Sequence, residues 1–317
     1  MKKLLIDPLS TAAPAKKAAK AAGFRVSAYI TVDSVDVIDT SNLSNGITDI
    51  ILIGDRPSYM SFDGQGNLVM ADQAVHAIQK MKAYIGDLPI RLYCTLGGEF
   101  ARVFSAPHAR TNLISHILSC LEKYGLDGAN FDWEFPANET EQGLYSEFLT
   151  SLGEAMGDRY TLSVALAHYC ADLTPEAIAA IDRVEMMNYD IWDDEQMHAS
   201  LPLAIESVQK MLAQGYRPEQ INMGIPFYAR PMTKEAYWYA YAGHYDKLDE
   251  KGLFYDEKTG LTFSFNDYGI VYKKTAWAIE NGLGGIMVFH YGCDLPADNK
   301  LALFNAIGQA VAEANLK

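Results

Sequence analysis

Eight short apolar runs are distributed along the chain, and their succession restricts the possible folds more than any other feature of the sequence. Runs of about four to eight apolar and β-branched residues are typical of buried strands. We predict strands at residues 25–31, 49–54, 90–96, 128–134, 160–167, 184–189, 221–227 and 285–290. Amphipathic helices are predicted at residues 72–84, 108–124, 141–156, 175–181, 201–214, 268–281 and 299–315.

This alternation of strands and helices indicates an α/β fold with a parallel sheet. Eight such units in about 290 residues suit one (β/α)8 TIM barrel, which typically needs about 250 residues. A doubly wound sheet is the alternative, but no Gly-x-Gly-x-x-Gly motif follows the first strand. We predict one catalytic barrel domain at residues 23–317, without a large insertion domain, preceded by a polar arm at residues 1–22. The first crossover, residues 32–48, has the weakest helical pattern.

Composition excludes several classes of protein. The 317 residues are 49% hydrophobic and 21% charged, which is too apolar for a disordered chain. A net charge of -14 argues against nucleic acid and anionic lipid as partners. No apolar stretch reaches the roughly 18 residues that cross a bilayer, so we expect no membrane partner either. The first residues open like an export signal, but Asp7 and Pro8 interrupt the apolar run, which leaves the localisation undetermined.

The sequence offers no pattern for a metal or a disulfide framework. The four cysteines, Cys94, Cys120, Cys170 and Cys293, lie far apart and form no Cys-x-x-Cys pair. Buried free thiols are therefore expected. No His-Glu-x-x-His motif is present. We expect neither a metal nor another cofactor.

The segment Asp127-Gly-Ala-Asn-Phe-Asp-Trp-Glu-Phe-Pro136, at the fourth predicted strand, is the most informative part of the chain. Side chains alternate along a strand, so Asn130, Asp132 and Glu134 share one face. Two carboxylates at this spacing repel each other, and the pKa of one should rise. A carboxyl group with a raised pKa is suited to general acid catalysis. The alternative, a buried polar plug at the barrel end, would bury carboxylates at a cost without a compensating role.

This segment resembles the DxxDxDxE signature of glycoside hydrolase family 18, the chitinase family. Asp127 matches the first Asp, Asp132 the third and Glu134 the catalytic Glu, whereas Asn130 stands where the second Asp usually is. Four further segments resemble family motifs in the same order along the chain. They are Thr-Leu-Gly-Gly at 95–98, Met-Asn-Tyr-Asp at 187–190, Gly-Ile-Pro-Phe-Tyr-Ala-Arg at 224–230 and Gly-Gly-Ile-Met at 284–287. The resemblance extends from about residue 25 to residue 294.

The resemblance implies a retaining hydrolase that cleaves β-1,4 bonds of N-acetylglucosamine oligomers or polymers by substrate-assisted catalysis. This family is an exception to the usual mechanism with a carboxylate nucleophile. Glu134 would protonate the glycosidic oxygen, and the 2-acetamido oxygen of the substrate would attack to give an oxazolinium intermediate. Asp132 would bind the acetamide N–H, and Tyr189 would donate its hydroxyl to the acetamide carbonyl. Asn130 would belong to the same catalytic group, without a proton to exchange.

The resemblance also implies a set of sugar-binding residues. They are Tyr29, Glu99, Asp127, Met187, Asp190, Tyr228, Arg230 and Phe289. Phe289 stands where most family members have a Trp, and Glu99 stands where chitinases often have one. Fewer aromatic platforms favour short oligosaccharides or a decorated glycan over long crystalline polymer.

The stretch at residues 229–265 is predicted to be irregular and is rich in aromatic residues, including Tyr237, Trp238 and Tyr255. Loops at the carboxyl ends of barrel strands build active sites, so these rings could bind sugar. They could equally form a small satellite core beneath the loop. The sequence does not decide between the two.

Two other functions remain open. The chain could be an endo-β-N-acetylglucosaminidase that acts on N-glycan chitobiose cores, or a chitinase-like lectin that binds without cleaving. Chitin, chitooligosaccharides or another glycan containing N-acetylglucosamine is the expected partner in each case. The resemblance implies a secreted protein, and we expect a monomer.

Overall fold

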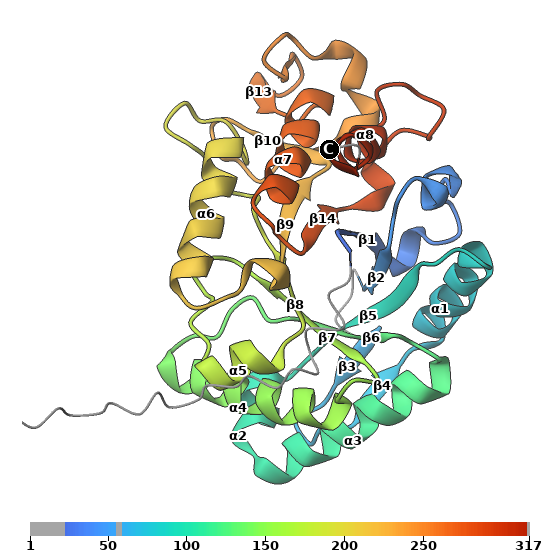
Figure 1. Ribbon diagram of the computed structural model, residues 1–317, viewed down its shortest axis with the longest axis vertical. Helices are drawn as coiled ribbons and strands as arrows, with labels where there is room; N and C mark the ends of the chain where they lie inside the picture. The colour runs from blue at the N-terminus through green and yellow to red at the C-terminus, as the bar shows by residue number, and fades with distance from the viewer. Residues whose placement is uncertain (1–22, 55–58, 316–317) are drawn as a thin grey trace, which may run out of the picture.

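Eight parallel strands pair side by side and close into a barrel in the computed structural model, which describes residues 23–54 and 59–315 (Figure 1). The barrel strands are β1 (Arg25–Thr31), β2 (Asp49–Ile53), β5 (Arg91–Gly98), β6 (Gly128–Asp132), β7 (Thr161–Leu166), β8 (Arg183–Met186), β9 (Ile221–Pro226) and β14 (Gly285–Phe289). The last strand pairs in parallel with the first, in the register Val26 to Ile286, and this pairing closes the barrel. The predicted (β/α)8 TIM barrel is confirmed.

Helices surround the barrel and cover its strands (Figure 1). They are α1 (Asp72–Ile85), α2 (Phe100–Ser105), α3 (Pro107–Tyr124), α4 (Glu139–Met156), α5 (Pro175–Ala180), α6 (Leu201–Ala213), α7 (Tyr268–Glu280) and α8 (Leu303–Asn315). In α3, Leu113, Ile117 and Leu121 recur every four residues and are buried, as expected for an amphipathic helix. Pro107 begins that helix, and Gly125 ends it in a left-handed conformation with φ +59°.

The structure departs from the predicted elements at the ends of β6 and β8. The sequence predicts strands through Glu134 and Tyr189, but β6 ends at Asp132 and β8 at Met186. Pro136 lacks the N–H that a continuing β6 would need for its ladder. Glu134 and Tyr189 therefore lie in the loops that leave the carboxyl end of the barrel.

The first crossover contains no α-helix. Two short 3-10 turns, η2 (Val32–Ser34) and η3 (Ser41–Ser44), connect β1 to β2. The helical pattern predicted over residues 32–48 is therefore wrong. A separate hairpin, β3 (Met60–Phe62) and β4 (Leu68–Met70), precedes α1 and extends the sheet beyond the closed barrel.

The stretch predicted as irregular forms a four-stranded antiparallel sheet. Its strands are β10 (Tyr228–Pro231), β11 (Tyr239–Ala240), β12 (Leu253–Asp256) and β13 (Leu261–Ser264), in the order β11-β10-β13-β12. The strands are too short for their alternation to be detected in the sequence. The satellite-core interpretation is confirmed for part of the aromatic residues, whereas sugar binding by the others stays a prediction. Tyr239 stacks on His244 and Phe263 in a satellite core, with ring centroids 4.6 and 4.4 Å away. Trp238 and Tyr237 remain about half exposed.

The amino end of the barrel is closed by a buried ionic cluster. Asp49 is fully buried, and the guanidinium groups of Arg183, Arg91 and Arg25 lie 2.8, 2.9 and 3.5 Å from its carboxylate. The Tyr93 hydroxyl donates to the same carboxylate at 2.9 Å. Four of the five residues are the first residues of their strands. This cluster occupies the end of the barrel opposite to the one where active sites form in this fold.

The remaining structural expectations concern cysteines, metals and membranes. All four cysteines are buried free thiols, as predicted. Within residues 23–54 and 59–315 no group of His, Cys, Asp and Glu could hold a metal ion. No helix of the described residues is long and apolar enough to cross a membrane. The polar arm predicted at residues 1–22 lies outside the described residues.

Candidate active site

The carboxyl end of β6 carries the two carboxylates of the signature. Asp132 is the last residue of the strand and is partly buried, and Glu134 lies in the loop beyond it and is exposed. Burial and the negative charge of Glu134 raise the pKa of Asp132 to about 7. Its Oδ1 atom is buried and has no hydrogen-bond partner among the residues that the structure describes. The Oδ1 atom of Asp132 is therefore free to accept a hydrogen bond from a bound ligand.

Glu134 has a raised pKa as well. Burial is the larger cause and the negative charge of Asp190 the second, and the hydrogen-bonding interaction with Asp132 acts in the opposite direction. Two neighbouring carboxyl groups with raised pKa values titrate as a pair and hold one proton between them near neutral pH. This proton is the one that a general acid at this position would donate.

Aromatic rings form a wall beside the carboxylates. Phe289, the last residue of β14, is partly buried, and its ring lies 5.6 Å from Tyr189, 5.7 Å from Tyr29 and 6.2 Å from Tyr228, centroid to centroid. The Tyr189 hydroxyl neither donates nor accepts a hydrogen bond among the described residues. Burial and the negative charge of Asp132 raise the pKa of Tyr189 well above its usual range, so the hydroxyl stays a neutral donor.

Asp190 follows Tyr189 and is held by three side chains. The Tyr228 hydroxyl donates to its Oδ1 at 2.9 Å, and Arg230 Nε lies 3.1 Å from the same oxygen. Its backbone N–H donates to His198 Nε2 at 2.9 Å, in a left-handed conformation with φ +56°. Burial alone would raise the pKa of Asp190, but the contacts with His198 and the charge of Arg230 outweigh it and lower the pKa. Asp190 is thus an ionised, fixed acceptor.

Asn130 lies fully buried in the barrel, two residues before Asp132 on the same strand. Its Oδ1 accepts hydrogen bonds from the hydroxyls of Tyr29 at 3.1 Å and Thr95 at 2.9 Å. Its Nδ2 donates to Ser163 Oγ at 3.1 Å. The amide therefore satisfies donors and acceptors from β1, β5 and β7 directly beneath the carboxylate pair.

Two of the predicted residues do not join this group. Asp127 precedes β6 at the amino end of the barrel, where its carboxylate accepts a hydrogen bond from the Leu92 N–H at 2.8 Å. Seven residues at about 3.3 Å each separate it from Glu134, so it cannot contact the same sugar. The Asp127 carboxylate thus has a structural role, because it joins the starts of β5 and β6.

Glu99 follows β5 and is exposed, with its carboxylate 3.0 Å from Arg102. Met187, just beyond β8, is partly buried.

Sequence reasoning missed three residues of this region, Tyr169, Glu185 and His198, whereas it included Trp238 among the aromatic residues of the irregular stretch. His198 lies eight residues after Asp190 and is 1% exposed. Trp238 is 51% exposed, and its ring lies 5.8 Å from that of Tyr228 and 6.1 Å from that of His290. Tyr169, 59% exposed, lies 5.6 Å from the ring of Phe135, just after Glu134. Nothing in the sequence marks Tyr169, Glu185 or His198, because only the closed barrel brings their segments together.

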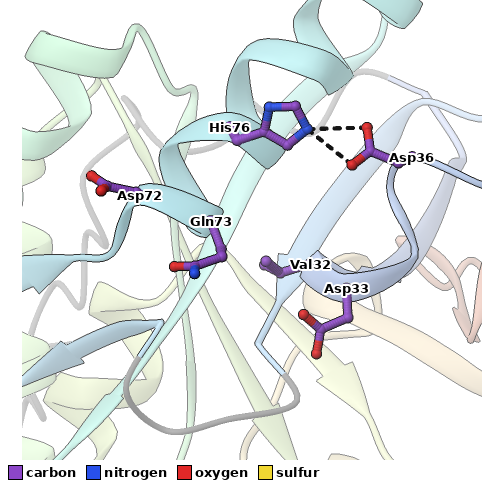
Figure 2. A pocket seen from close by; sticks show the side chains of 6 residues that line it. All are labelled: Val32, Asp33, Asp36, Asp72, Gln73 and His76. Atoms are coloured by element: carbon purple, nitrogen blue, oxygen red, sulfur yellow. Dashed lines mark hydrogen bonds and ion pairs between the residues drawn. The ribbon is translucent and has the colours of Figure 1, made fainter.

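A separate pocket opens between the η2 segment and the start of α1 (Figure 2). Its volume is about 340 Å³, and its lining residues are Val32, Asp33, Asp36, Asp72, Gln73 and His76. Figure 2 shows the His76 ring directed toward the Asp36 carboxylate, with which its Nε2 forms 3.0 Å contacts. The Tyr59 hydroxyl donates to Asp33 at 2.6 Å. None of the signature carboxylates lines this pocket, so we assign the candidate active site to the end of β6.

Comparisons with known proteins agree with the arrangement. Probable chitinase 10 of Drosophila melanogaster is 25% identical over 169 residues, which cover 44% of this chain and 7% of that protein. This chain thus spans only a small part of that relative. Chitinase B of Serratia marcescens is 20% identical over 351 residues, covering 74% of this chain and 70% of the relative.

A solved structure shares the fold over nearly the whole chain. It is the GH18 chitinase ChiB from the chitin utilization locus of Flavobacterium johnsoniae, with a TM-score of 0.75 and 21% identity. The match covers 92% of this chain and 94% of that one. The model of the family described as glycosyl hydrolases family 18 matches residues 26–294, which include every strand of the barrel except the first residue of β1. This protein belongs to glycosyl hydrolase family 18.

Proposed function

We propose that the protein is a retaining glycoside hydrolase that cleaves β-1,4 bonds between N-acetylglucosamine units of chitin oligomers. The observation that carries the proposal is the Asp132–Glu134 pair, which holds a proton near neutral pH beside the free hydroxyl of Tyr189. Chitinase names among the relatives favour chitin or its oligomers as the substrate.

The reaction starts with the proton of Glu134. Glu134 transfers it to the glycosidic oxygen as the bond between that oxygen and the anomeric carbon breaks. The 2-acetamido carbonyl oxygen of the same sugar forms the new bond to the anomeric carbon, which gives an oxazolinium ion. A correctly placed intramolecular nucleophile can lower the activation free energy of the reaction by about 7–11 kcal/mol.

Two side chains orient the acetamide. The Tyr189 hydroxyl donates to its carbonyl oxygen, and the free Oδ1 of Asp132 accepts its N–H. The negative charge of Asp132 stabilises the positive charge that develops on the oxazolinium ring. In the second step Glu134 removes a proton from water, and that water attacks the anomeric carbon and opens the ring. Two displacements at the same carbon give a product that keeps the β configuration.

The surroundings suit an uncharged sugar. Phe289 offers an apolar face among three tyrosines, and such faces pack against the C–H faces of pyranose rings. The charge of Asp190 is compensated by Arg230, so the pair offers hydrogen bonds to sugar hydroxyls without a net charge. Phe289 has a smaller face than a tryptophan at the same position would have. We therefore propose short oligosaccharides rather than crystalline polymer as the preferred substrate.

The main test is Glu134→Gln on a fluorogenic N,N′-diacetylchitobioside. Loss of the general acid should lower kcat by about 10²–10⁴-fold. Glu147→Gln, on the outer face of α4 and 64% exposed, is the matched control and should retain wild-type activity. Equal rates for the wild type and Glu134→Gln would refute the role of Glu134.

Two further measurements separate the remaining alternatives. Digestion of chitotetraose in parallel with a high-mannose glycoprotein distinguishes a chitooligosaccharidase from an endo-β-N-acetylglucosaminidase. Cleavage of neither substrate would favour a lectin. The anomer that forms first, followed by NMR, should be β, and an initial α anomer would exclude substrate-assisted retention.

A further inference from the structure

A continuous series of hydrogen bonds leads from Asn130 down the barrel to a second buried acid. Asn130 Nδ2 donates to Ser163 Oγ, and the Ser163 hydroxyl in turn donates to Glu185 Oε1 at 3.0 Å. Asn222 Nδ2 donates to both oxygens of Glu185 at 3.1 and 3.0 Å. Glu185 is 1% exposed and lies on β8, whereas Ser163 and Asn222 lie on the flanking strands β7 and β9. The group is built into the barrel and is not part of its surface.

The direction of these bonds depends on Glu185. A hydroxyl has one proton, and because Ser163 gives its proton to Glu185, its oxygen is left to accept from the Asn130 amide. The amide is thereby fixed with its Oδ1 toward the hydroxyls of Tyr29 and Thr95. Asn130 itself has no proton to exchange. The titratable group of this layer is therefore Glu185 on β8, which β7 separates from Asn130 on β6.

We propose that Glu185 is a positioning residue for the Asp132–Glu134 pair and replaces the acid that is missing at position 130. Glu185 fixes the Asn130 amide through Ser163, and it extends the pH range over which the pair keeps its proton. This inference rests on the proposed function, because it assigns the pair its catalytic proton.

Several charged or titratable groups face Glu185 and influence its electrostatic environment. Arg183, Arg25 and Asp49 lie toward the amino end, Tyr93 lies beside Asp49, and Tyr29 and Tyr189 lie toward the carboxyl end. Burial raises the pKa of Glu185 to about 7, against the hydrogen bonds from Asn222 and Ser163 and the charge of Arg183. Glu185 therefore gains its negative charge in the same pH range in which Asp132 would lose its proton.

The sign of the effect follows from like charges. Above about pH 7 an ionised Glu185 disfavours a second ionisation in the pair above it, so the pair releases its proton at a higher pH. Glu185→Gln removes this charge and keeps the shape of the side chain. The alkaline limb of the kcat/KM profile should therefore move to lower pH, by on the order of 1 unit for two like charges within the same barrel at an effective dielectric constant of about 20.

The experiment measures this shift in two independent ways. The first is the pH profile of kcat/KM on a chitooligosaccharide, and the second is the titration of the Asp132 carboxyl followed by carbon-13 NMR in the free enzyme. Glu185→Asp keeps the charge and should keep the wild-type limb. Ser27→Ala is the matched control, because Ser27 is buried nearby and its hydroxyl accepts from Asn222 Nδ2 at 3.2 Å but forms no hydrogen bond with Glu185, Ser163 or Asn130 among the described residues. It should leave both readouts unchanged.

A charge exchange provides a second test that does not depend on Glu185→Gln alone. Asn130→Asp places two buried acids on Ser163, and it should lower the urea midpoint of unfolding and move the pH profile. Asn130→Asp with Glu185→Gln restores one acid to the layer, and it should recover most of the lost stability. Additive effects of the two substitutions would overturn the proposal.

The outcomes also separate this inference from the proposed function. If the wild type cleaves no N-acetylglucosamine oligomer, the proposed function fails, and the NMR titration and the unfolding cycle still test Glu185. If the wild type cleaves them and Glu185→Gln leaves both the alkaline limb and the Asp132 titration in place, the proposed function stands and the inference about Glu185 fails.

Discussion

The two ends of the barrel treat buried carboxylates in opposite ways. At the amino end Asp49 is fully buried but lies within 3.5 Å of three guanidinium groups. At the carboxyl end Asp132 has another carboxyl group as its neighbour, and one of its oxygens has no partner in the described part of the chain. The paired carboxylate at the amino end stabilises the fold, whereas the unpaired one at the carboxyl end has a raised pKa and can keep a proton that a catalytic step would use. The comparison predicts that equivalent substitutions at the two ends have different consequences.

The largest expected effect is on activity at the carboxyl end. Asp132→Asn keeps the shape of the side chain but removes the charge that would stabilise the oxazolinium ion. We expect a loss of about 10²–10³-fold in kcat, the range found when one group that stabilises a developing charge is removed. The assay is initial-rate hydrolysis of a chitobioside, with circular dichroism to establish that the variant is folded. A folded variant with wild-type kcat would show that the charge of Asp132 has no role in the reaction.

The next effect is on stability at the amino end. Asp49→Asn removes the carboxylate that three buried or partly buried guanidinium groups share, and this should lower the free energy of unfolding by about 3–5 kcal/mol. Urea unfolding measures the loss. Asp36→Asn is the control, since its pair with His76 and Lys80 is exposed and screened by solvent and should leave the urea midpoint nearly unchanged.

The third prediction concerns stability at the carboxyl end and has the opposite sign. The folded-state pKa of Asp132 is raised to about 7, above the value of an unfolded chain, so the stability it contributes is present below pH 4 and is lost as pH rises to 7. Asp132→Asn avoids ionisation and should be more stable than the wild type at pH 8, by about 2 kcal/mol because the group is only partly buried. The difference should vanish at pH 4. Equal urea midpoints at both pH values would contradict the raised pKa.

Much of the fold could be predicted because barrel strands are continuous apolar runs and their order is the order of the chain. The carboxylate face of β6 followed from the same alternation, which placed Asn130, Asp132 and Glu134 together. The ends of elements were harder, because Glu134 and Tyr189 leave the ladder where backbone pairing stops, and pairing depends on neighbouring strands. The antiparallel sheet from β10 to β13 escaped prediction because strands of two to four residues carry too little periodicity.

The partners of the site residues could not be predicted, for a different reason. Glu185 appears in the sequence as one acid in a strand, and its connection to Asn130 exists only because β7 lies between β6 and β8 in the closed barrel. His198 contacts Asp190 across a loop whose path the sequence does not specify. The cluster around Asp49 likewise unites first residues of four strands. Asp127 shows the converse, since its match to a signature implied sugar binding although the strand predicted at residues 128–134 already placed it at the amino end.

The smallest expected effect tests how far the open end of the barrel extends as a sugar-binding surface. Trp238 is 51% exposed beside Tyr228 and His290, at the edge of the antiparallel sheet that contains β11. An exposed aromatic face that stacks on a sugar contributes about 1 kcal/mol, so Trp238→Ala should raise KM for chitotetraose by about fivefold and leave kcat nearly unchanged. Tyr255→Ala removes an equally exposed ring from β12, at the opposite edge of the same sheet, and should not alter KM. If neither variant changes KM, the sugar does not reach this sheet, and the site ends at the ring of Phe289. If only Trp238→Ala weakens binding, the sheet between β9 and β14 adds a binding surface to the end of the barrel where charge is left uncompensated.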